Sequence, residues 1–549
     1  MTDASGRGFE GEPLKGGEAE GGVSKEKSCT GKLGLPHLTG WRTATFLLSL
    51  FLCLAVVFAF SFILPCPVRP HYLSTWNHTL PDAATYDFLA VEDANKDKVL
   101  DVIFLYKGAE ASRNTCMSED LSPPCLVLLA VDGTDGKMLW KRPLAAEFNW
   151  VECGVKGIGF KGTGCLVAHA DNLTAIDKQT GGIVWQQSRS SMMNGNLPLI
   201  SVPDLDSDGA EEFAVLSYNP QAPSFTPIPT ELVFFSGKSG DQIGSRVNVD
   251  LNGVFGHLQF KMASGASYLL LLTDSGLSAV SLQQLAARAR TGLGSALKKE
   301  NSWEDKADHQ TGFIHLYQSD SLKRVLVVHG GSSPSLLVQT DSSVSLLHMD
   351  KLNIAWTTNT STLLSVPTFG QFDKDGIPDI IIEEDLGNET KRVMILSGRS
   401  GDVLWKVNLL SWTQSPRPAS VLTLNTYSVF MLWGQNHGNE TMHSSFLLHP
   451  RYSQLLLELR NPAQNIISFK ATLLERGRHA CYLVLTGPDG RQHAESGGTE
   501  SVVLTKRKIK DDVSESAVRG VAADEPISED TEESVKEAFK RLRFSDELF

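Results

Sequence analysis

The stretch "DGTDGKMLWKRPL", residues 132–144, contains a turn with glycine, three further residues and then Trp140. The same order of residue types recurs in "DKQTGGIVWQQS" (177–188), "SGKSGDQIGSRVNV" (236–249) and "SGRSGDVLWKVNL" (397–409). Gly244 takes the tryptophan position in the third copy, and a weaker fifth copy, "LHMDKLNIAWTT", contains Trp356. A turn between the last two strands of a small sheet, followed by a large aromatic side chain that docks on the next sheet, is what a radial repeat requires. The repeat therefore predicts a β-propeller.

The sequence between these phrases is that of an all-β protein. Short apolar runs such as "VIFLY", "CLVLLAV" and "DIIIEE" alternate with Gly, Asp and Asn, as expected of buried strands joined by turns. Trp140 and Trp185 are 45 residues apart, and Trp356 and Trp405 are 49 apart, which are blade lengths of a propeller. The strand groups predict eight blades over residues 81–510, or seven because the fourth group is thin; an array of β-sandwiches is the alternative. The predicted blades are 84–143, 147–188, 197–250, 253–285, 312–358, 363–410, 418–460 and 465–510.

A hydrophobic segment precedes the strands. The run "FLLSLFLCLAVVFAFSFIL", residues 46–64, carries no charge over 19 residues. At ~1.5 Å per residue, a helix of this length crosses roughly the ~30 Å apolar core of a bilayer. Basic residues before it predict a cytosolic N-terminus by the positive-inside rule; they are Lys25, Lys27, Lys32 and Arg42. We predict a transmembrane signal-anchor helix in a single-pass type II protein, at the cell surface or in the secretory pathway.

Composition separates both ends of the chain from its middle. Residues 1–45 are rich in Gly, Glu and Lys and predict a disordered cytosolic tail. Residues 65–80 are expected to form a stalk, and 511–549 an acidic tail. Residues 281–299 predict a helical insertion or a loop. In the acidic tail, the spacing i, i+3, i+4, i+7 predicts a short amphipathic helix that packs under the propeller or binds a partner; its apolar residues are Val535, Ala538, Phe539 and Leu542.

Sequons and cysteines agree with an oxidising compartment. Five N-x-S/T sequons follow the hydrophobic segment and predict glycosylation: Asn77, Asn172, Asn359, Asn388 and Asn439. Six cysteines follow it as well, an even number that suits disulfides. Short separations favour two local pairs, Cys116–Cys125 and Cys153–Cys165, and Cys66 and Cys481 remain.

The phrase "VPDLDSDGAEEFAVLSY", residues 202–218, predicts a calcium loop between two strands. Three aspartates alternate, and Gly209 lets the chain bend so that their carboxylates converge on one cation. Calcium takes about six to eight oxygen ligands. The predicted ligands are Asp204, Asp206, Asp208 and Glu212, with the carbonyl of Ala210. An EF-hand would have its closing glutamate where Val215 stands, so this is a nine-residue β-hairpin loop.

Two related loops occur elsewhere in the chain. The stretch "EDANKDKVLDVIFLY" (92–106) offers Asp93, Asn95, Asp97 and Asp101, with Lys98 in place of the glycine. The stretch "GQFDKDGIPDIIIEE" (370–384) offers Asp373, Asp375 and Asp379, with Gln371 at the first position. Ligand number and charge favour calcium most in the loop at 204–212, then in the loop at 93–101, then in the loop at 371–379.

Aspartate-rich loops that open propeller blades resemble the FG-GAP repeats of integrin α-chains. With the hydrophobic segment, three stretches resemble the vertebrate integrin-α FG-GAP-repeat-containing membrane proteins, family with sequence similarity 234: "FLLSLFLC" (46–53), "PCPVRP" (65–70) and "YDFLAVEDANKDKVLDVIFLYK" (86–107). The resemblance spans nearly the whole chain. It implies a membrane-anchored propeller with calcium loops, without the legs of an integrin α-chain, and it brings no defined enzymatic activity.

The net charge and the absence of common catalytic and metal-binding motifs reduce the number of possible function classes. The formal net charge of −13 disfavours nucleic acid as a partner and suits a cation-binding surface. No C-x-x-C, H-E-x-x-H or G-x-S-x-G motif occurs. We predict a glycoprotein that is not an enzyme and that recognises or scaffolds unknown protein partners. One alternative is a glycan- or small-molecule-binding propeller. The other is a relict quinoprotein-like enzyme, because the Gly-x-x-x-Trp phrase also resembles the docking motif of quinoprotein dehydrogenases.

Overall fold

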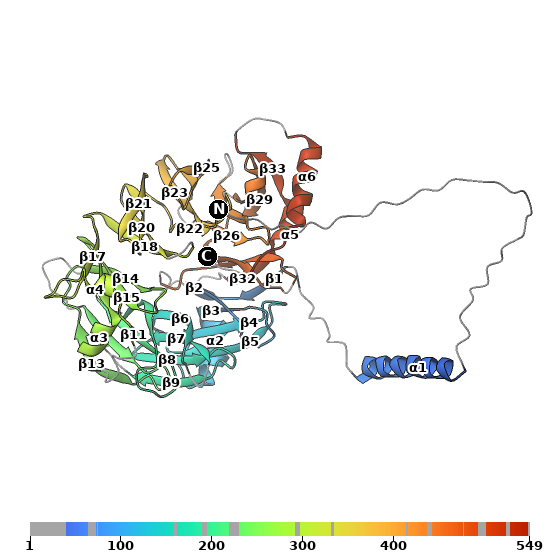
Figure 1. Cartoon of the computed structure of the whole chain (residues 1–549), viewed down its shortest axis with the longest axis horizontal. Coiled ribbons are helices and arrows are strands. Elements are labelled where there is room, and N and C mark those ends of the chain that lie inside the picture. Colours follow the sequence, from blue (N-terminus) through green and yellow to red (C-terminus); the bar gives the residue numbers. More distant parts are fainter. Residues whose placement is uncertain are drawn as a thin grey trace, which may run out of the picture. The chain divides into compact units, whose positions relative to one another are not determined.

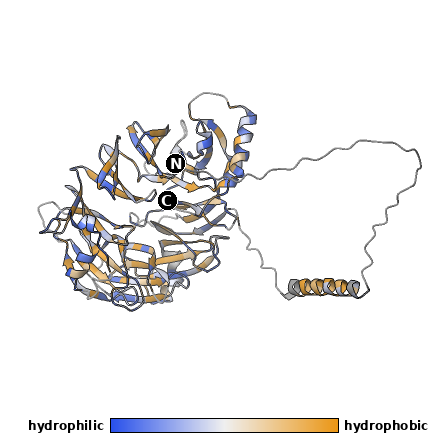
Figure 2. Cartoon of the chain, in the orientation of Figure 1, coloured by the Kyte–Doolittle hydropathy of each residue, from blue (hydrophilic) through white to orange (hydrophobic). Residues whose placement is uncertain are grey.

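The computed structural model describes residues 40–63, 73, 75–158, 162–188, 195–218, 230–290, 297–330, 334–412, 415–435, 442–475, 477–491, 501–522 and 527–546. The chain divides into two compact units, Met1–Arg69 and Pro70–Phe549. In the first unit, helix α1 (Gly40–Ile63) covers most of the segment predicted to span a membrane, and Figure 2 shows it as largely hydrophobic. Across the described residues, no helix combines the length and apolar character needed to cross a membrane.

The second unit is an eight-bladed β-propeller, as Figure 1 shows. The first four blades are β2 (Ala83–Glu92) to β5 (Met138–Leu144), β6 (Phe148–Lys156) to β9 (Ile183–Ser188), β10 (Gly195–Val202) to β13 (Gln242–Asn248), and β14 (Val254–Lys261) to β17 (Ile314–Gln318). Their middle strands are β3 (Asp101–Gly108), β4 (Leu126–Val131), β7 (Thr163–His169), β8 (Asn172–Asp177), β11 (Glu212–Ser217), β12 (Glu231–Phe235), β15 (Ser267–Thr273) and β16 (Gly276–Ser281). The all-β propeller prediction is confirmed, and the blade number is eight.

The last four blades follow the same plan. They are β18 (Leu322–Val328) to β21 (Asn353–Asn359), β22 (Thr368–Gly370) to β25 (Val403–Leu410), β26 (Ala419–Leu422) to β29 (Leu455–Pro462), and β30 (Ile466–Leu473) to β32 (Val502–Lys508). Their other strands are β19 (Ser335–Thr340), β20 (Ser343–His348), β23 (Asp379–Gly387), β24 (Thr390–Leu396), β27 (Ser428–Gln435), β28 (Met442–Leu448) and β31 (Ala480–Thr486). A single pairing, Leu410 with Gln435, joins blades six and seven into one sheet.

Antiparallel neighbours define the two faces of the ring. Connections between the first and second strands, and between the third and fourth, lie on one face, which we call the loop face. Connections between the second and third strands lie on the opposite face. Each blade packs its apolar side chains against the next, so strands such as β4 are buried along their whole length. One such core joins Ile103 and Leu105 of blade one to Val151 and Val167 of blade two.

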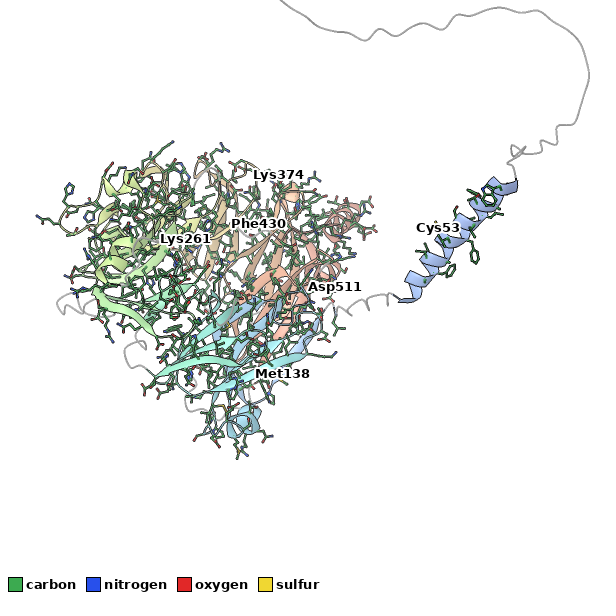
Figure 3. All side chains as sticks on the ribbon, turned by 60° about the horizontal axis from the view of Figure 1, so that its bottom comes forward. Cys53, Met138, Lys261, Lys374, Phe430 and Asp511 are labelled. Atoms are coloured by element: carbon green, nitrogen blue, oxygen red, sulfur yellow. A yellow bond between two sulfur atoms is a disulfide. The ribbon has the colours of Figure 1, made fainter. Side chains whose placement is uncertain are left out.

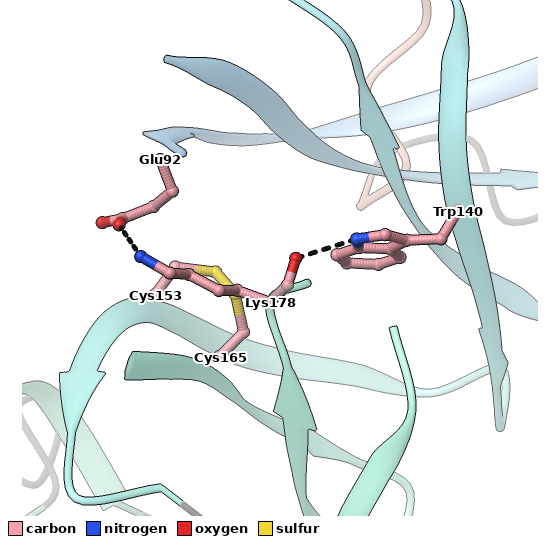
Figure 4. The surroundings of a disulfide bond; sticks show 5 residues. All are labelled: Glu92, Trp140, Cys153, Cys165 and Lys178. Atoms are coloured by element: carbon pink, nitrogen blue, oxygen red, sulfur yellow. Dashed lines mark hydrogen bonds and ion pairs between the residues drawn. A yellow bond between two sulfur atoms is a disulfide. The ribbon is translucent and has the colours of Figure 1, made fainter. Parts of the chain in front are cut away.

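Tryptophans of the repeat dock four of the blades on the blades that follow them, as predicted. The Trp140 Nε1 donates to the carbonyl of Lys178 at 2.8 Å, and its ring packs on Gly181, where a Cβ atom would lie 2.5 Å from the ring. Figure 4 shows this contact together with the ion pair from Lys178 Nζ to Glu92, at 3.1 Å. Three more tryptophans donate to the following blade: Trp185 to Gly237 (2.8 Å), Trp356 to Gly398 (3.0 Å) and Trp405 to Ser453 (2.8 Å).

An insertion in blade four compensates for the missing tryptophan. Blade three has Gly244 in place of tryptophan, and helix α3 (Leu282–Arg288) packs there, accepting a hydrogen bond from Ser245 N at the Ala289 carbonyl (2.7 Å). Helix α4 (Asn301–Glu304) then supplies Trp303, whose Nε1 donates to the carbonyl of Met349 in blade five at 3.3 Å. The described part of the predicted insertion at 281–299 is therefore part of the ring. Strand β17, which follows it, completes blade four, which corrects the prediction that residues from 312 onward begin blade five.

Strand β1 (Trp76–Leu80) closes the ring, which corrects the end of the predicted stalk at 65–80; residues 65–72 and 74 lie outside the described residues. It pairs with β32 as the outer strand of blade eight, because the C-terminal part of the chain supplies only three strands to that blade. Figure 1 shows β1 in blue beside β32 in red. Trp76 then docks on blade one: its Nε1 donates to the carbonyl of Gly133 at 3.2 Å.

The predicted tail at 511–549 also belongs to the propeller. Strand β33 (Ala517–Gly520) adds to the outer edge of blade seven, beside β29. Helices α5 (Ile509–Glu515) and α6 (Glu529–Lys540) bury Val513, Val535 and Phe539 in one core with blades seven and eight. The amphipathic helix is confirmed and packs on the propeller. Helix α2 (Ala109–Met117) and the short η2 (Pro450–Tyr452) were not predicted.

Because Trp76 closes the ring, Trp76→Ala should lower the free energy of unfolding by about 3–5 kcal/mol, the cost of deleting a buried aromatic side chain. Urea unfolding followed by circular dichroism measures this change. Trp41→Ala is the matched control, because Trp41 is exposed on α1. Equal stability of the Trp76→Ala variant and the wild type would show that β1 does not hold the ring closed.

Candidate metal centre

The three acidic loops have one backbone conformation and lie on the loop face. Each joins the first and second strands of its blade, as predicted: β2–β3, β10–β11 and β22–β23. In each, the fourth and sixth residues have positive φ: Lys96 and Lys98, Ser207 and Gly209, Lys374 and Gly376. Aspartates at the fifth position accept a backbone N–H two residues on, at 2.7 to 2.8 Å: Asp97 from Val99, Asp208 from Ala210 and Asp375 from Ile377. The three predicted hairpin loops are thus confirmed as loops.

The last acid of the first and third loops holds the loop to its blade. Asp101 Oδ2 accepts from Ala94 N at 2.8 Å, and its Oδ1 accepts from Gly133 N at 3.1 Å. Asp379 repeats this with Phe372 N at 2.6 Å and Gly398 N at 3.1 Å. Burial raises the pKa of both carboxyl groups to about 6, against the opposing effect of these N–H donors. Both oxygens of each group are therefore engaged by the protein.

Glu212, the last acid of the second loop, is engaged at one oxygen only. Its Oε2 accepts from Leu205 N, whereas its Oε1 is buried and has no hydrogen-bond partner. The residue is 2% exposed. Burial, followed by repulsion from Asp206, Asp204 and Asp208, raises the pKa of Glu212 to about 8. A buried carboxylate oxygen without a donor is costly unless something else satisfies it.

The second loop gathers four carboxylates around that oxygen. Asp204, Asp206, Asp208 and Glu212 each offer an oxygen, and these atoms all lie within 4.8 Å of one another. Within the described chain, this is the one group of three or more His, Cys, Asp or Glu side chains so arranged. Carboxylate oxygens are the ligands that calcium prefers. The donor set and the unpartnered Glu212 oxygen fit a hard divalent cation, so these residues would hold calcium.

In the third loop, a basic side chain of the protein already pairs with one of the aspartates. Arg399 Nε donates to Asp375 Oδ2 at 2.7 Å, so an arginine already neutralises the central aspartate. Its counterpart in blade three, Lys238, donates to the backbone carbonyl of Asp208 at 3.2 Å. Gln371 replaces the first acid, and its Oε1 is buried without a partner. This loop has less need of a metal ion than the second.

The first loop is intermediate between the other two. Asp93 Oδ1 is buried without a partner, and Asp93 Oδ2 accepts from Lys98 N at 3.2 Å. The side-chain Nδ2 of Asn95 donates to Asp132 at 3.4 Å, and its Oδ1 accepts from Asp97 N at 2.9 Å. Ranked by how far the protein itself satisfies their acidic groups, the loops fall in the predicted order of preference for calcium, with the second loop first and the third last. Occupancy of each loop stays a prediction.

The structure also places the predicted disulfides and sequons. Cys116–Cys125 and Cys153–Cys165 are both disulfides, which confirms the two local pairs; Figure 4 shows the second. Cys481 is a free, buried cysteine, and Cys66 lies outside the described residues. Asn77, Asn359 and Asn388 are exposed and Asn172 is half-buried, whereas Asn439 also lies outside the described residues.

Two substitutions distinguish a carboxylate that holds its loop by hydrogen bonds, Asp379, from one that is predicted to bind metal, Glu212. In chelator at pH 8, Asp379→Asn should lower the free energy of unfolding by about 1–3 kcal/mol, because an amide NH₂ group would face backbone donors. Glu212→Gln should cost less, because no donor faces its Oε1. Urea unfolding of both variants measures the difference. A larger loss for Glu212→Gln than for Asp379→Asn would contradict this assignment.

Comparison with known proteins agrees with the fold and with the predicted resemblance. Residues 76–545, which begin at the closing strand β1, match the family described as FAM234A/B beta-propeller. Protein FAM234A of Rattus norvegicus is 34% identical over 528 residues, which cover 93% of this chain and 92% of that protein. Protein FAM234A of Homo sapiens is 33% identical over 527 residues, with the same coverage.

The second branch of the family is less similar. Protein FAM234B of Gallus gallus is 28% identical over 500 residues, which cover 86% of this chain and 78% of that protein. The predicted resemblance to family with sequence similarity 234 is therefore confirmed. The chain belongs to the FAM234A/B beta-propeller family.

Proposed function

We propose that this chain is a single-pass type II membrane glycoprotein whose propeller, stabilised by calcium in the second acidic loop, recognises proteins through its loop face. The role is one of recognition or scaffolding and not of catalysis. One observation carries the proposal: large exposed apolar side chains recur beside the loop face of four blades. They form the apolar rim, which consists of Met138, Ile183, Val184, Ile354 and Val403.

The apolar rim has a regular place in the fold. Each of its residues lies one or two positions before a docking tryptophan, at the start of an outer strand where the chain leaves a turn on the loop face. Met138 and Ile183 belong to neighbouring blades, as do Ile354 and Val403; Figure 3 labels Met138. Single exposed apolar residues are ordinary on a protein surface, but a repeated set on one face is typical of a binding surface.

The four predicted glycans at described residues would leave this face open. Asn172 and Asn388 lie at connections between second and third strands, and Asn359 ends an outer strand, so all three lie toward the opposite face. Asn77 lies on the edge strand β1. Glycans at these positions would cover the opposite face and one edge. A protein partner would then reach the acidic loops and the apolar rim without hindrance.

The membrane anchor is supported by the sequence of the first unit. Residues 46–64 carry no charge, and the basic residues lie on their N-terminal side. The large apolar side chains described on α1, such as Phe51 and Phe58, are exposed. An exposed helix of this composition is stable in contact with lipid and not with water.

Calcium should raise the stability of the propeller through the second loop. Addition of calcium at one hundred times Kd should stabilise the folded state by ~2.7 kcal/mol, because the ion binds only the folded chain. Thermal melting of the full chain in calcium and in chelator measures this. Glu212→Gln and Asp206→Ala should abolish most of the rise in melting temperature. Asp375→Ala is the control and should abolish less, because Arg399 already pairs with Asp375.

Equal melting temperatures in calcium and in chelator would show that the acidic loops are only solvated turns. An equal loss of the calcium effect in Asp375→Ala and Glu212→Gln would contradict the ranking of the loops.

Proximity labelling tests recognition and topology together. A peroxidase fused after the C-terminus should label extracellular or lumenal proteins in living cells, and Met138→Lys or Ile183→Lys should reduce labelling of the partner several-fold. Met117→Lys is the matched control, because Met117 is exposed on α2 at the opposite face. Labelling of cytosolic proteins would overturn the topology, and labelling unchanged by the rim variants would overturn the binding surface.

A further inference from the structure

A cavity lies at the axis of the ring, between the innermost strands of blades five to eight. Its volume is about 450 Å³, within the range of about 300–1,000 Å³ that is usual for small-molecule sites. Strands β22, β26 and β30 line it, with Leu326 of β18. Asp546, near the C-terminus, lies at the same cavity. The acidic loops and the apolar rim take no part in it, except for Leu100 at the end of the first loop.

Apolar side chains form most of the wall. Leu326, Val366, Phe369, Val421 and Phe469 all line the cavity. They come from four different blades, so the wall is formed by the ring and not by one blade. Walls of this kind favour a ligand with an apolar body, because its burial removes apolar surface from water.

Two cations enter this apolar cavity. Arg417 precedes β26, and Lys470 lies on β30; both are exposed to solvent. Neither side chain forms a hydrogen bond or ion pair with another residue in the described part of the chain. Asp546 is the one carboxylate among the lining residues, so the lining residues carry a net positive charge.

The surroundings of the two cations do not neutralise them. Glu92 attracts Lys470, but Glu92 is already paired with Lys178 at 3.1 Å. Desolvation by the surrounding protein lowers the pKa of Lys470 although the side chain is exposed in part, the charge of Glu92 raises it, and the charge of Arg417 lowers it. Arg417 also borders a second cavity of about 620 Å³, where Asp87 and Asp489 lie, without forming an ion pair with either.

We propose that the axial cavity binds an organic anion with an apolar body, whose acid group lies between Arg417 and Lys470. The apolar walls would bury the body of the ligand. The guanidinium of Arg417 matches the two oxygens of a carboxylate or the oxygens of a sulfonate, and the ammonium of Lys470 adds a second charge-assisted hydrogen bond. The site is independent of calcium.

The test uses 2-naphthoate as probe and 2-naphthamide as its neutral counterpart of the same shape, in calorimetric titration of the full chain. The wild type should bind the anion and not the amide. Arg417→Gln and Lys470→Gln should each weaken binding about tenfold or more, the effect of losing one charge-assisted hydrogen bond. Both side chains are exposed, so neither change threatens folding. Lys323→Gln is the control, because Lys323 pairs with Asp341 outside this cavity.

A second titration with dodecanoate identifies the source of the ligand. Tighter binding of dodecanoate than of 2-naphthoate supports a lipid-derived acid, and the reverse supports a compact aromatic acid. The proposal is overturned if neither anion binds at millimolar concentration. It is also overturned if 2-naphthamide binds as tightly as 2-naphthoate, or if Arg417→Gln and Lys470→Gln both leave the affinity unchanged.

Discussion

In two blades, the glycine after the third strand forms two hydrogen bonds, one to the docking tryptophan of the preceding blade and one to the last aspartate of its own acidic loop. The carbonyl of Gly398 accepts the indole N–H of Trp356 from the preceding blade, and its N–H donates to Asp379 of its own acidic loop. Gly133 does the same between Trp76 and Asp101. No side chain is tolerated there, because a Cβ atom on Gly398 would lie 2.1 Å from the carbonyl oxygen of Pro378. The docking of one blade on the next and the conformation of the acidic loop therefore depend on the same glycine.

The second acidic loop departs from this plan at a single residue, and its chemistry follows from that departure. Trp185 still docks on Gly237, but Glu212 stands where the other loops have aspartate. Its Oε1 is left buried among three aspartates without a hydrogen-bond donor. A cation there would replace the missing N–H donor. Calcium would then stabilise the loop.

Features formed by residues close together in the sequence could be predicted, whereas contacts between distant residues could not. The glycine and tryptophan of a blade lie four residues apart, so the repeat was visible, and the acids of each loop are nearly consecutive. Trp76 was missed because its sheet partners lie more than four hundred residues away, and Trp303 because a helix presents it without the repeat phrase. Arg399 neutralises Asp375 from 24 residues downstream, a contact that only the folded hairpin creates.

The direct test of this account is a double-mutant cycle between a docking tryptophan and the acid that shares its glycine. Trp356→Phe removes the indole donor and keeps a ring, and Asp379→Asn weakens the hold on the Gly398 N–H. Because the two side chains share one partner, urea unfolding should give a coupling free energy of about 0.5–3 kcal/mol. Trp140→Phe with Asp379→Asn, which share no partner, should be additive. Additivity of the first pair, to within ~0.5 kcal/mol, would contradict the account.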